Sequence, residues 1–203
     1  MSDFLMRARP HDEVGIPLVQ AELSKLGAAA FGYGVEQYPR ELARAMLTQR
    51  DDTAYKVRFA PDLVPVWPGL LTLFCEVKTE SQGSDNFAVE ADAYRGSLLH
   101  DSGGMVLYAF VDLTQRTVVG CWARDIKTPR RILVPNRPDY KESQERMYRN
   151  FPQAKVEAIS WRNGSGTPFF LIPKRWPVFL PFSVFMVQRG PLAPRQAEQG
   201  ALL

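Results

Sequence analysis

The alternation of apolar and polar positions along the chain stops between residues 70 and 77, where Thr72 and Glu76 alone interrupt a run of apolar side chains. So continuous an apolar stretch predicts a strand that is buried on both faces within a sheet. Glu76 and Lys78 stand at its end, and because strand side chains alternate, they point to the same face. Two opposite charges at the end of a core strand are costly to bury unless the protein uses them.

A second strand-like run covers residues 55–59, just upstream of Asp62. Pro65, Pro68 and Gly69 follow, and these residue types favour turns. The pattern therefore predicts a hairpin that brings Asp62 to the side of Glu76.

Two carboxylates and a lysine at one sheet edge suit a hard divalent cation. Mg²⁺ prefers oxygen ligands and keeps several waters, so one or two carboxylates and a substrate phosphate are enough to bind it. Lys78 could then orient or deprotonate an attacking water. The alternative is an edge strand with a solvated Glu76–Lys78 pair, which the preceding apolar run disfavours.

Pro61-Asp62 and Glu76-Val77-Lys78 together resemble the signature of the PD-(D/E)xK nuclease superfamily. The resemblance implies an α/β fold with the restriction-endonuclease-like αβββαβ core and a mixed central sheet. It also implies metal-dependent hydrolysis of phosphodiester bonds, as in small phage or bacterial junction resolvases and restriction-type endonucleases. Asp62 and Glu76 would be metal ligands together with the main-chain carbonyl of Val77, and Lys78 would be the catalytic lysine. The implied cofactor is Mg²⁺, with Mn²⁺ as a substitute.

The first predicted helix starts near Pro17 and ends before Gly27. Nucleases of this type often carry a further acidic residue there, pointing toward the site. Glu13 and Glu22 are the candidates, and Glu13 is preferred as a catalytic residue because it lies at the start of the segment. The alternative for both is a solvated helix charge.

Further elements follow the same pattern analysis. Residues 28–35 predict a strand, residues 39–47 a short helix, and residues 105–112 and 117–123 two strands. Asp85 is predicted to cap a helix running to about His100, because Phe87, Ala91, Tyr94 and Leu98 have the spacing of a buried stripe. Tyr94 is interpreted as a core residue. The resemblance thus spans residues 13–123.

The last third of the chain differs in character. Lys127, Arg130 and Arg131 lie in a cation-rich stretch that could contact a phosphate backbone, with a solvated loop as the alternative. A polar helix is expected over residues 139–150, and strands over residues 155–161 and 167–172 flank a turn signal at residues 163–166. Dense aromatic residues after position 168 indicate core capping first and dimerisation second, with stacking on nucleic-acid bases as the remaining alternative. We therefore expect a nuclease core over residues 1–123 and an accessory element over residues 124–203 packed on it.

The totals set broad limits. A chain of 203 residues with 45% hydrophobic and 23% charged residues is typical of one globular domain with an appended element. A net charge of +3 is compatible with a nucleic-acid partner without requiring one. Cys75 and Cys121 lie in apolar runs, which favours free buried thiols. A signal peptide and a membrane-length apolar run are both absent, so a cytoplasmic protein of a bacterial or phage-infected cell is expected.

The residue pattern leaves three alternatives open, on the nucleic acid, on the oligomeric state and on the function. DNA is the expected partner, but the residues do not distinguish it from RNA, nor a monomer from a homodimer. A catalytically inactive nucleic-acid-binding or assembly subunit that retains the nuclease fold is the rival function. Against it, a buried Asp62, Glu76 and Lys78 trio without a metal would be costly to keep.

Overall fold

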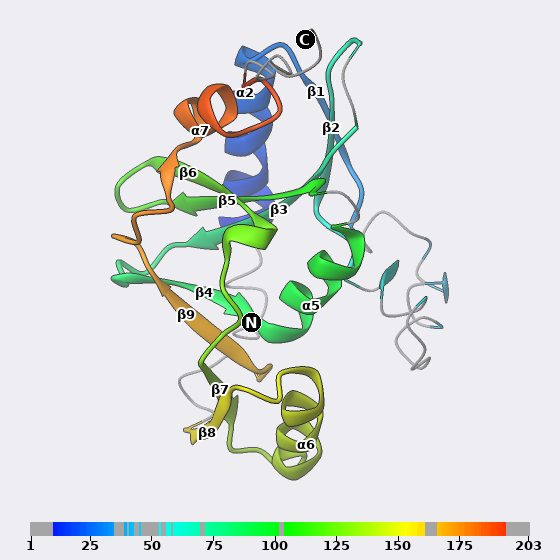
Figure 1. Cartoon of the computed structure of the whole chain (residues 1–203), viewed down its shortest axis with the longest axis vertical. Coiled ribbons are helices and arrows are strands. Elements are labelled where there is room, and N and C mark those ends of the chain that lie inside the picture. The colour runs from blue at the N-terminus through cyan, green and yellow to red at the C-terminus, as the bar shows by residue number, and fades with distance from the viewer. Residues whose placement is uncertain are drawn as a thin grey trace, which may run out of the picture.

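The chain forms a mixed α/β fold built on two sheets (Figure 1). The computed structural model describes residues 10–34, 39, 41–42, 45, 53, 56–57, 59–69, 72–101, 104–160 and 166–193. The larger sheet has the order β1 (Ala29–Gly32), β2 (Leu63–Val66), β3 (Phe74–Glu80), β5 (Val106–Asp112), β6 (Thr117–Trp122) and β10 (Leu180–Pro181). The smaller sheet has the order β4 (Asn86–Glu90), β9 (Phe169–Pro173), β7 (Arg131–Pro135) and β8 (Lys155–Ile159).

Helices surround both sheets. They are a π-helical turn η1 (His11–Gly15), α2 (Ile16–Lys25), α5 (Ala91–His100), a short 3₁₀ turn η3 (Ala123–Asp125), α6 (Tyr140–Asn150) and α7 (Phe182–Gln188). None of the helices in the described part of the chain combines the length and apolar character needed to cross a membrane.

The larger sheet begins as an antiparallel meander of β1, β2 and β3. After α5, the chain returns as β5, which is parallel to β3 along its whole length, and β6 then pairs antiparallel with β5. The pair Leu63↔Cys75 sets the register of β2 against β3. This register places Asp62, the residue before β2, beside the middle of β3.

The strand predicted over residues 70–77 begins only at Phe74, and Leu70 and Leu71 lie outside the described residues. Within β3, Cys75, Glu76 and Val77 are buried, so this part of the strand is covered on both faces, as the apolar pattern predicts. Cys75 and Val77 point into a core formed with α2 and α7, which lie on the same face of the larger sheet (Figure 1). Glu76 and Lys78 therefore point to the opposite face, toward the second core between this sheet, α5 and the smaller sheet. The predicted placement of the two charges on one face is confirmed by their ion pair.

The predicted helix from Asp85 to about His100 is wrong in its first turn. Residues 86–90 form the strand β4, and α5 begins only at Ala91. Phe87 and Val89 both enter the core, which is the period-two pattern of a strand. β4 is held by antiparallel pairing with β9, so that a segment more than eighty residues later decides its conformation.

Two shorter predictions also need correction. In the expected strand over residues 55–59, Lys56 and Val57 are helical, and Tyr55 and Arg58 lie outside the described residues. The strands around residues 163–166 do not pair with each other, because β7 lies between β8 and β9. Of the predicted helix over residues 39–47, Glu41, Leu42 and Ala45 are helical, Pro39 is not, and the rest lies outside the described residues.

The two halves of the chain are interleaved. β4 leaves the first half to join β9, β7 and β8, whereas β10 and α7 return to the larger sheet. Phe182 and Phe185 of α7 enter the core on that sheet, and Gly120 lets them approach, since a Cβ there would lie 2.7 Å from the Phe185 ring. Segments therefore cross the division expected at residue 123 in both directions.

Lys174, just after β9, ties the two sheets together. Its ammonium lies 3.0 Å from a carboxylate oxygen of Glu80 and also contacts the carboxylate of Asp112. Asp112 accepts further hydrogen bonds from the main-chain N–H groups of Thr114 and Gln115. The ends of β3 and β5 are thus joined to the smaller sheet by a nearly buried ion cluster.

Gly15 is expected to be intolerant of a side chain. A Cβ at this position would lie 2.1 Å from the Thr79 hydroxyl oxygen, so Gly15→Ala must push η1 away from β3. We expect a loss of about 2 kcal/mol in the free energy of unfolding, measured by chemical denaturation, as is usual for overpacking. Adding Thr79→Ala should restore part of that loss. A Gly15→Ala variant as stable as the wild type would mean that η1 does not pack this way.

Candidate active site

Asp62 lies beside β3, where the hairpin was predicted to bring it. Its Oδ2 accepts a hydrogen bond of 2.7 Å from the main-chain N–H of Val77. The N–H and C=O groups of one strand residue point to the same side of the strand. The Val77 carbonyl therefore faces the same side as the Asp62 carboxylate.

Glu76 and Lys78 form a close ion pair with 2.5 Å between Oε1 and Nζ. The Glu76 side chain is 6% exposed and that of Lys78 is 19% exposed, so the pair is only just in reach of solvent. The edge-strand alternative with a solvated pair is therefore excluded.

The buried pair sits in a negative environment. Burial raises the pKa of Glu76, the positive charge of Lys78 opposes that shift, and the carboxylate of Asp62 adds to it. Burial lowers the pKa of Lys78, but the neighbouring carboxylates, that of Glu76 first, outweigh it and raise this pKa above its usual value. Lys78 is thus an ammonium that donates hydrogen bonds, which favours an orienting role over that of a base.

His11 is a site residue that the sequence pattern did not indicate. Its Nδ1 is 3.0 Å from the Thr79 hydroxyl oxygen, and its Nε2 is 3.8 Å from Oδ1 of Asp62. The π-helical turn that carries His11 is seated on β3 through Gly15. An isolated histidine ahead of a predicted helix carries no periodic signal, so only the tertiary contact reveals it.

The acidic candidates of the first helix lie on η1 and on α2. Glu13 is exposed on the same turn as His11, and Glu22 pairs with Lys25 at 2.6 Å on the exposed side of α2. A catalytic role for Glu13 stays a prediction, whereas the residue of this segment found beside Asp62 is His11.

Glu90 is a further acidic neighbour. It ends β4 and is the residue before α5, and Thr167 donates a hydrogen bond of 3.1 Å to its Oε1. The charge of Glu90 raises the pKa of both Glu76 and Lys78. This contribution is smaller than those of burial and of the Asp62 carboxylate. The candidate site is therefore bordered by the junction of β4 and α5.

The donors at this site fit a magnesium-type ion better than a closed metal cage. Within the described residues, no three His, Cys, Asp or Glu side chains are grouped closely enough to hold a metal ion on their own. Two carboxylates and a main-chain carbonyl are oxygen donors, and Mg²⁺ completes such a set with water and substrate phosphate. A cation there would also neutralise the buried charge of Glu76 beside Asp62.

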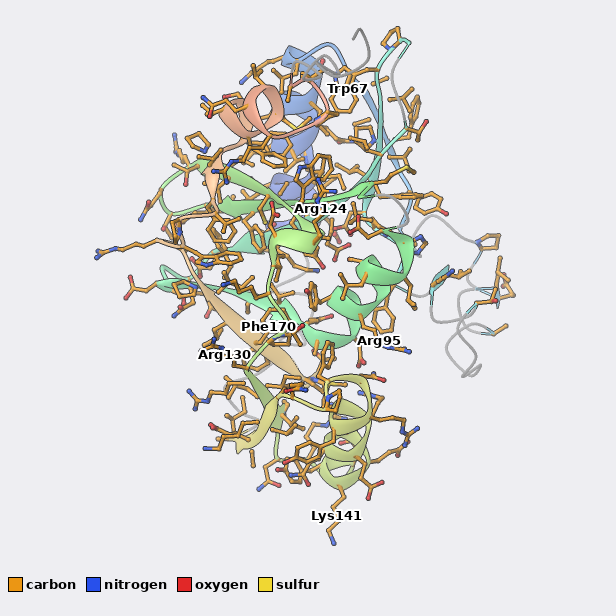
Figure 2. The ribbon with its side chains drawn as sticks, viewed as in Figure 1. Trp67, Arg95, Arg124, Arg130, Lys141 and Phe170 are labelled. Atoms are coloured by element: carbon orange, nitrogen blue, oxygen red, sulfur yellow. The ribbon has the colours of Figure 1, made fainter. Side chains whose placement is uncertain are left out.

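The predicted phosphate-contacting residues lie in and before the smaller sheet. Lys127 and Arg130 are exposed, and Figure 2 shows Arg130 beside β9, on the opposite side of the molecule from Arg95 of α5. Arg131 begins β7 with its side chain 64% exposed and is 2.6 Å from a carboxylate oxygen of Glu157. Their contact with a phosphate backbone stays a prediction.

Tyr94 is a core residue, as interpreted from the sequence. It is 2% exposed, and its hydroxyl donates a 2.6 Å hydrogen bond to the main-chain carbonyl of Ile126. Its ring contacts the rings of Phe151 and Phe170. α5 thus contributes to the core through this side chain.

Tyr94→Phe is expected to lower the free energy of unfolding by about 1–2 kcal/mol, because it leaves the buried Ile126 carbonyl without its donor. Tyr148→Phe on α6, where the tyrosine is 45% exposed, should leave that free energy unchanged. Urea denaturation of both variants tests the difference. Equal stability of the two would show that the Tyr94 hydrogen bond contributes nothing measurable.

Comparisons with known proteins add little. The chain matches no family model, and it matches no curated protein. Among solved structures, it is similar to a nuclease from a fusselovirus, with 12% sequence identity over 85% of this chain and 84% of the other, at a TM-score of 0.38. A similarity with so low a TM-score assigns neither a fold nor an activity to this chain. The function of this chain has to be inferred from its own residues.

Proposed function

We propose that this chain is a metal-dependent nuclease of the PD-(D/E)xK type, which hydrolyses phosphodiester bonds in DNA. The observation that carries the proposal is the convergence of its signature residues. The hydrogen bond from the Val77 N–H to Asp62 joins the first carboxylate to the strand that bears Glu76 and Lys78. Asp62 is thereby joined to the strand of Glu76 and Lys78, although it is more than ten residues away in sequence. Two carboxylates suit a cation, and the Lys78 ammonium suits a phosphate.

The order of elements supports the same proposal. α2 is followed by the antiparallel strands β1, β2 and β3, then by α5, and then by β5 parallel to β3. Apart from β4 and the helical residues between β1 and β2, this order is compatible with the αβββαβ sequence that the resemblance implies. β4, β6 and β10 are additions to that order.

The roles of the chain's own residues follow from the geometry. Oδ1 of Asp62, a carboxylate oxygen of Glu76 and the Val77 carbonyl would hold Mg²⁺, which supplies an acidified water and charge neutralisation when bound. Lys78, fixed by Glu76, is placed to donate a hydrogen bond to the attacking water or to the phosphate. Its charge stabilises negative charge developing on the phosphate oxygens, in a site from which most water is excluded. The contact between His11 Nδ1 and the Thr79 hydroxyl keeps the imidazole ring of His11 next to Asp62.

The direct test is cleavage of end-labelled single-stranded, duplex, flap and four-way-junction DNA with Mg²⁺, Mn²⁺ or EDTA. We expect cleavage with either cation and none with EDTA. A Lys78→Met variant purified identically controls for contaminating nucleases. Failure to cleave any of these substrates with either cation, by protein shown to be folded, would overturn the proposal, and cleavage of RNA alone would correct its substrate.

One observation favours a second candidate, a nucleic-acid-binding subunit without activity. The closed Glu76–Lys78 pair already compensates the buried carboxylate, so the pair needs no metal to persist. Calorimetry with Mg²⁺ or Ca²⁺ separates the two functions. Saturable cation binding that Asp62→Asn abolishes supports the nuclease, whereas absence of binding in the presence of DNA supports the inactive subunit.

A further inference from the structure

The smaller sheet has one face in the core and one face turned outward. Phe87, Val89, Ile132, Val134, Val156, Phe170 and Ile172 point inward. Because strand side chains alternate, the residues between them point out. The outer face of this sheet includes Ala88 and Glu90 on β4, Phe169 and Leu171 on β9, Arg131 and Leu133 on β7, and Lys155, Glu157 and Ile159 on β8. Leu133 is only 8% exposed, because its neighbours on this face cover most of it.

The strand registers place apolar side chains next to one another at the centre of this face. Ala88 lies opposite Leu171, and Phe169 lies between Glu90 and Leu133. Leu171 is 46% exposed, which is unusual for a leucine in the middle of a strand. An aromatic ring and an exposed leucine thus share a flat surface with small or apolar neighbours.

Cations line one side of that apolar centre. Arg131 and Lys155 are opposite each other in register, and their side chains are 64% and 77% exposed. Both contact Glu157, at 2.6 Å and 3.0 Å, so two cations share one carboxylate. Arg130, exposed just before β7, adds another positive charge beside β9 (Figure 2).

The opposite side of the outer face ends at β4, which borders the larger sheet. Glu90 is the last residue of β4 and lies opposite Phe169 in register. β4 contacts both β9 of this sheet and β3 of the larger one, the strand that carries Glu76 and Lys78. The strand at this edge of the outer face is therefore also a neighbour of the strand that carries the candidate site.

We propose that the outer face binds a single strand of nucleic acid, with bases against Phe169 and Leu171 and phosphates at Arg130, Arg131 and Lys155. Bases stack on aromatic side chains irrespective of sequence, and flanking cations hold the backbone. A duplex keeps its bases internal and offers nothing to the apolar centre. For its catalytic consequence this inference rests on the proposed function. It makes the substrate a single-stranded end or flap that reaches the site past Glu90.

The test is fluorescence anisotropy of a labelled oligothymidine, with EDTA present so that no cleavage occurs. Phe169→Ala with Leu171→Ala should weaken binding about tenfold or more, since a stacked base contributes appreciably to affinity. Arg131→Ala with Lys155→Ala should reduce the slope of log K against log salt by about 1.4, at roughly 0.7 per phosphate contact on a single strand.

Matched controls come from other surfaces. Val187→Ala removes an apolar side chain that is 49% exposed on α7, and Lys141→Ala removes a cation at the far end of α6 (Figure 2). Both should bind the oligothymidine like the wild type. If Phe169→Ala fails to fold by circular dichroism, Leu171→Ala alone carries the test, because its side chain is largely solvent-exposed.

The outcomes separate this inference from the proposed function. Tighter binding of a duplex of equal length, or unchanged oligothymidine binding by the outer-face variants, overturns the single-strand surface whether or not the protein cleaves DNA. Loss of binding in those variants, together with a wild type inactive with every cation, upholds the surface and rejects the nuclease. Loss of both binding and single-strand cleavage in the variants, with an active wild type, upholds both.

Discussion

Replacing Lys78 with methionine is expected to reduce the rate of DNA cleavage by about 10²–10⁴-fold, the usual contribution of a positioned proton-donating or proton-accepting group. Methionine keeps most of the volume of the side chain, which is 19% exposed, but removes the ammonium that lies 2.5 Å from Glu76. The two carboxylates and the Val77 carbonyl remain. Cation and DNA binding should therefore persist while chemistry is lost.

Single-turnover cleavage in Mg²⁺ measures the chemical step, and a DNA titration in Ca²⁺ measures binding. Lys78→Arg is the informative companion, because it keeps the charge but changes the shape and position of the donors. If Lys78→Met cleaves within about threefold of the wild type, Lys78 is not catalytic. If the same substitution abolishes folding and binding together, the Glu76–Lys78 pair is structural, and the nuclease proposal loses its main support.

Replacing Lys174 with methionine is expected to produce the largest loss of stability, about 3 kcal/mol in the free energy of unfolding at neutral pH. The substitution leaves Glu80 and Asp112 facing each other, with side chains that are 10% and 2% exposed and no cation between them. Removing one partner of a buried ion cluster is costly because the remaining charges stay desolvated.

The same cluster sets a dependence on pH. Burial raises the pKa values of Glu80 and Asp112, but hydrogen bonds from Lys174 and from nearby donors outweigh it and hold both pKa values below their usual range. Carboxylates with a lowered pKa in the folded state stabilise it above their unfolded pKa values, near 4, and this contribution is lost as the pH falls below them. The wild type should therefore lose stability below about pH 4, and Lys174→Met should lose less.

Lys25→Met provides the control for Lys174. Lys25 also pairs with a carboxylate, at 2.6 Å from Glu22, but its side chain is 69% exposed. Exposed pairs contribute about 0–1 kcal/mol, so this variant should unfold almost like the wild type. Urea denaturation of the three proteins at several pH values decides the matter. Equal losses for the two lysines would show that the Lys174 cluster is not a structural tie.

The local sequence pattern was sufficient to predict that the strand of Glu76 is buried and that Asp62 lies beside it. The apolar run before Glu76 predicted a buried strand with the first carboxylate beside it, and the Asp62–Val77 hydrogen bond has that geometry. The strand that pairs with β3 is β2, which contains Pro65, a residue that the pattern had assigned to the turn. Such features depend on residues within one hairpin, where side-chain period and turn chemistry act over short distances. The assignment of Tyr94 to the core followed likewise from helical spacing, but the same stripe wrongly predicted a buried Leu98, which is 41% exposed.

Elements held by distant partners could not be predicted in this way. The sequence of residues 86–90 fits two patterns of buried positions. Phe87 has the spacing of a helix with Ala91 and Tyr94, and Phe87 and Val89 have the alternation of a strand. Pairing with β9 decides between them, and β9 lies about eighty residues further along the chain. His11 was missed for a related reason, since Thr79 and Asp62, which give it a place at the site, are 68 and 51 residues away.

The return of α7 to the larger sheet has a consequence for synthesis on the ribosome. Phe182, Phe185 and Met186 cover a core face that β3, β5 and β6 would otherwise expose, and the Trp122 indole donates a hydrogen bond to the main-chain carbonyl of Arg189. A nascent chain that has emerged only as far as β6 therefore presents an apolar sheet face that α2 covers only in part. Contacts of such long sequence separation form slowly. The nascent chain is consequently most vulnerable to aggregation after the strands of the larger sheet have emerged and before α7 can seal them.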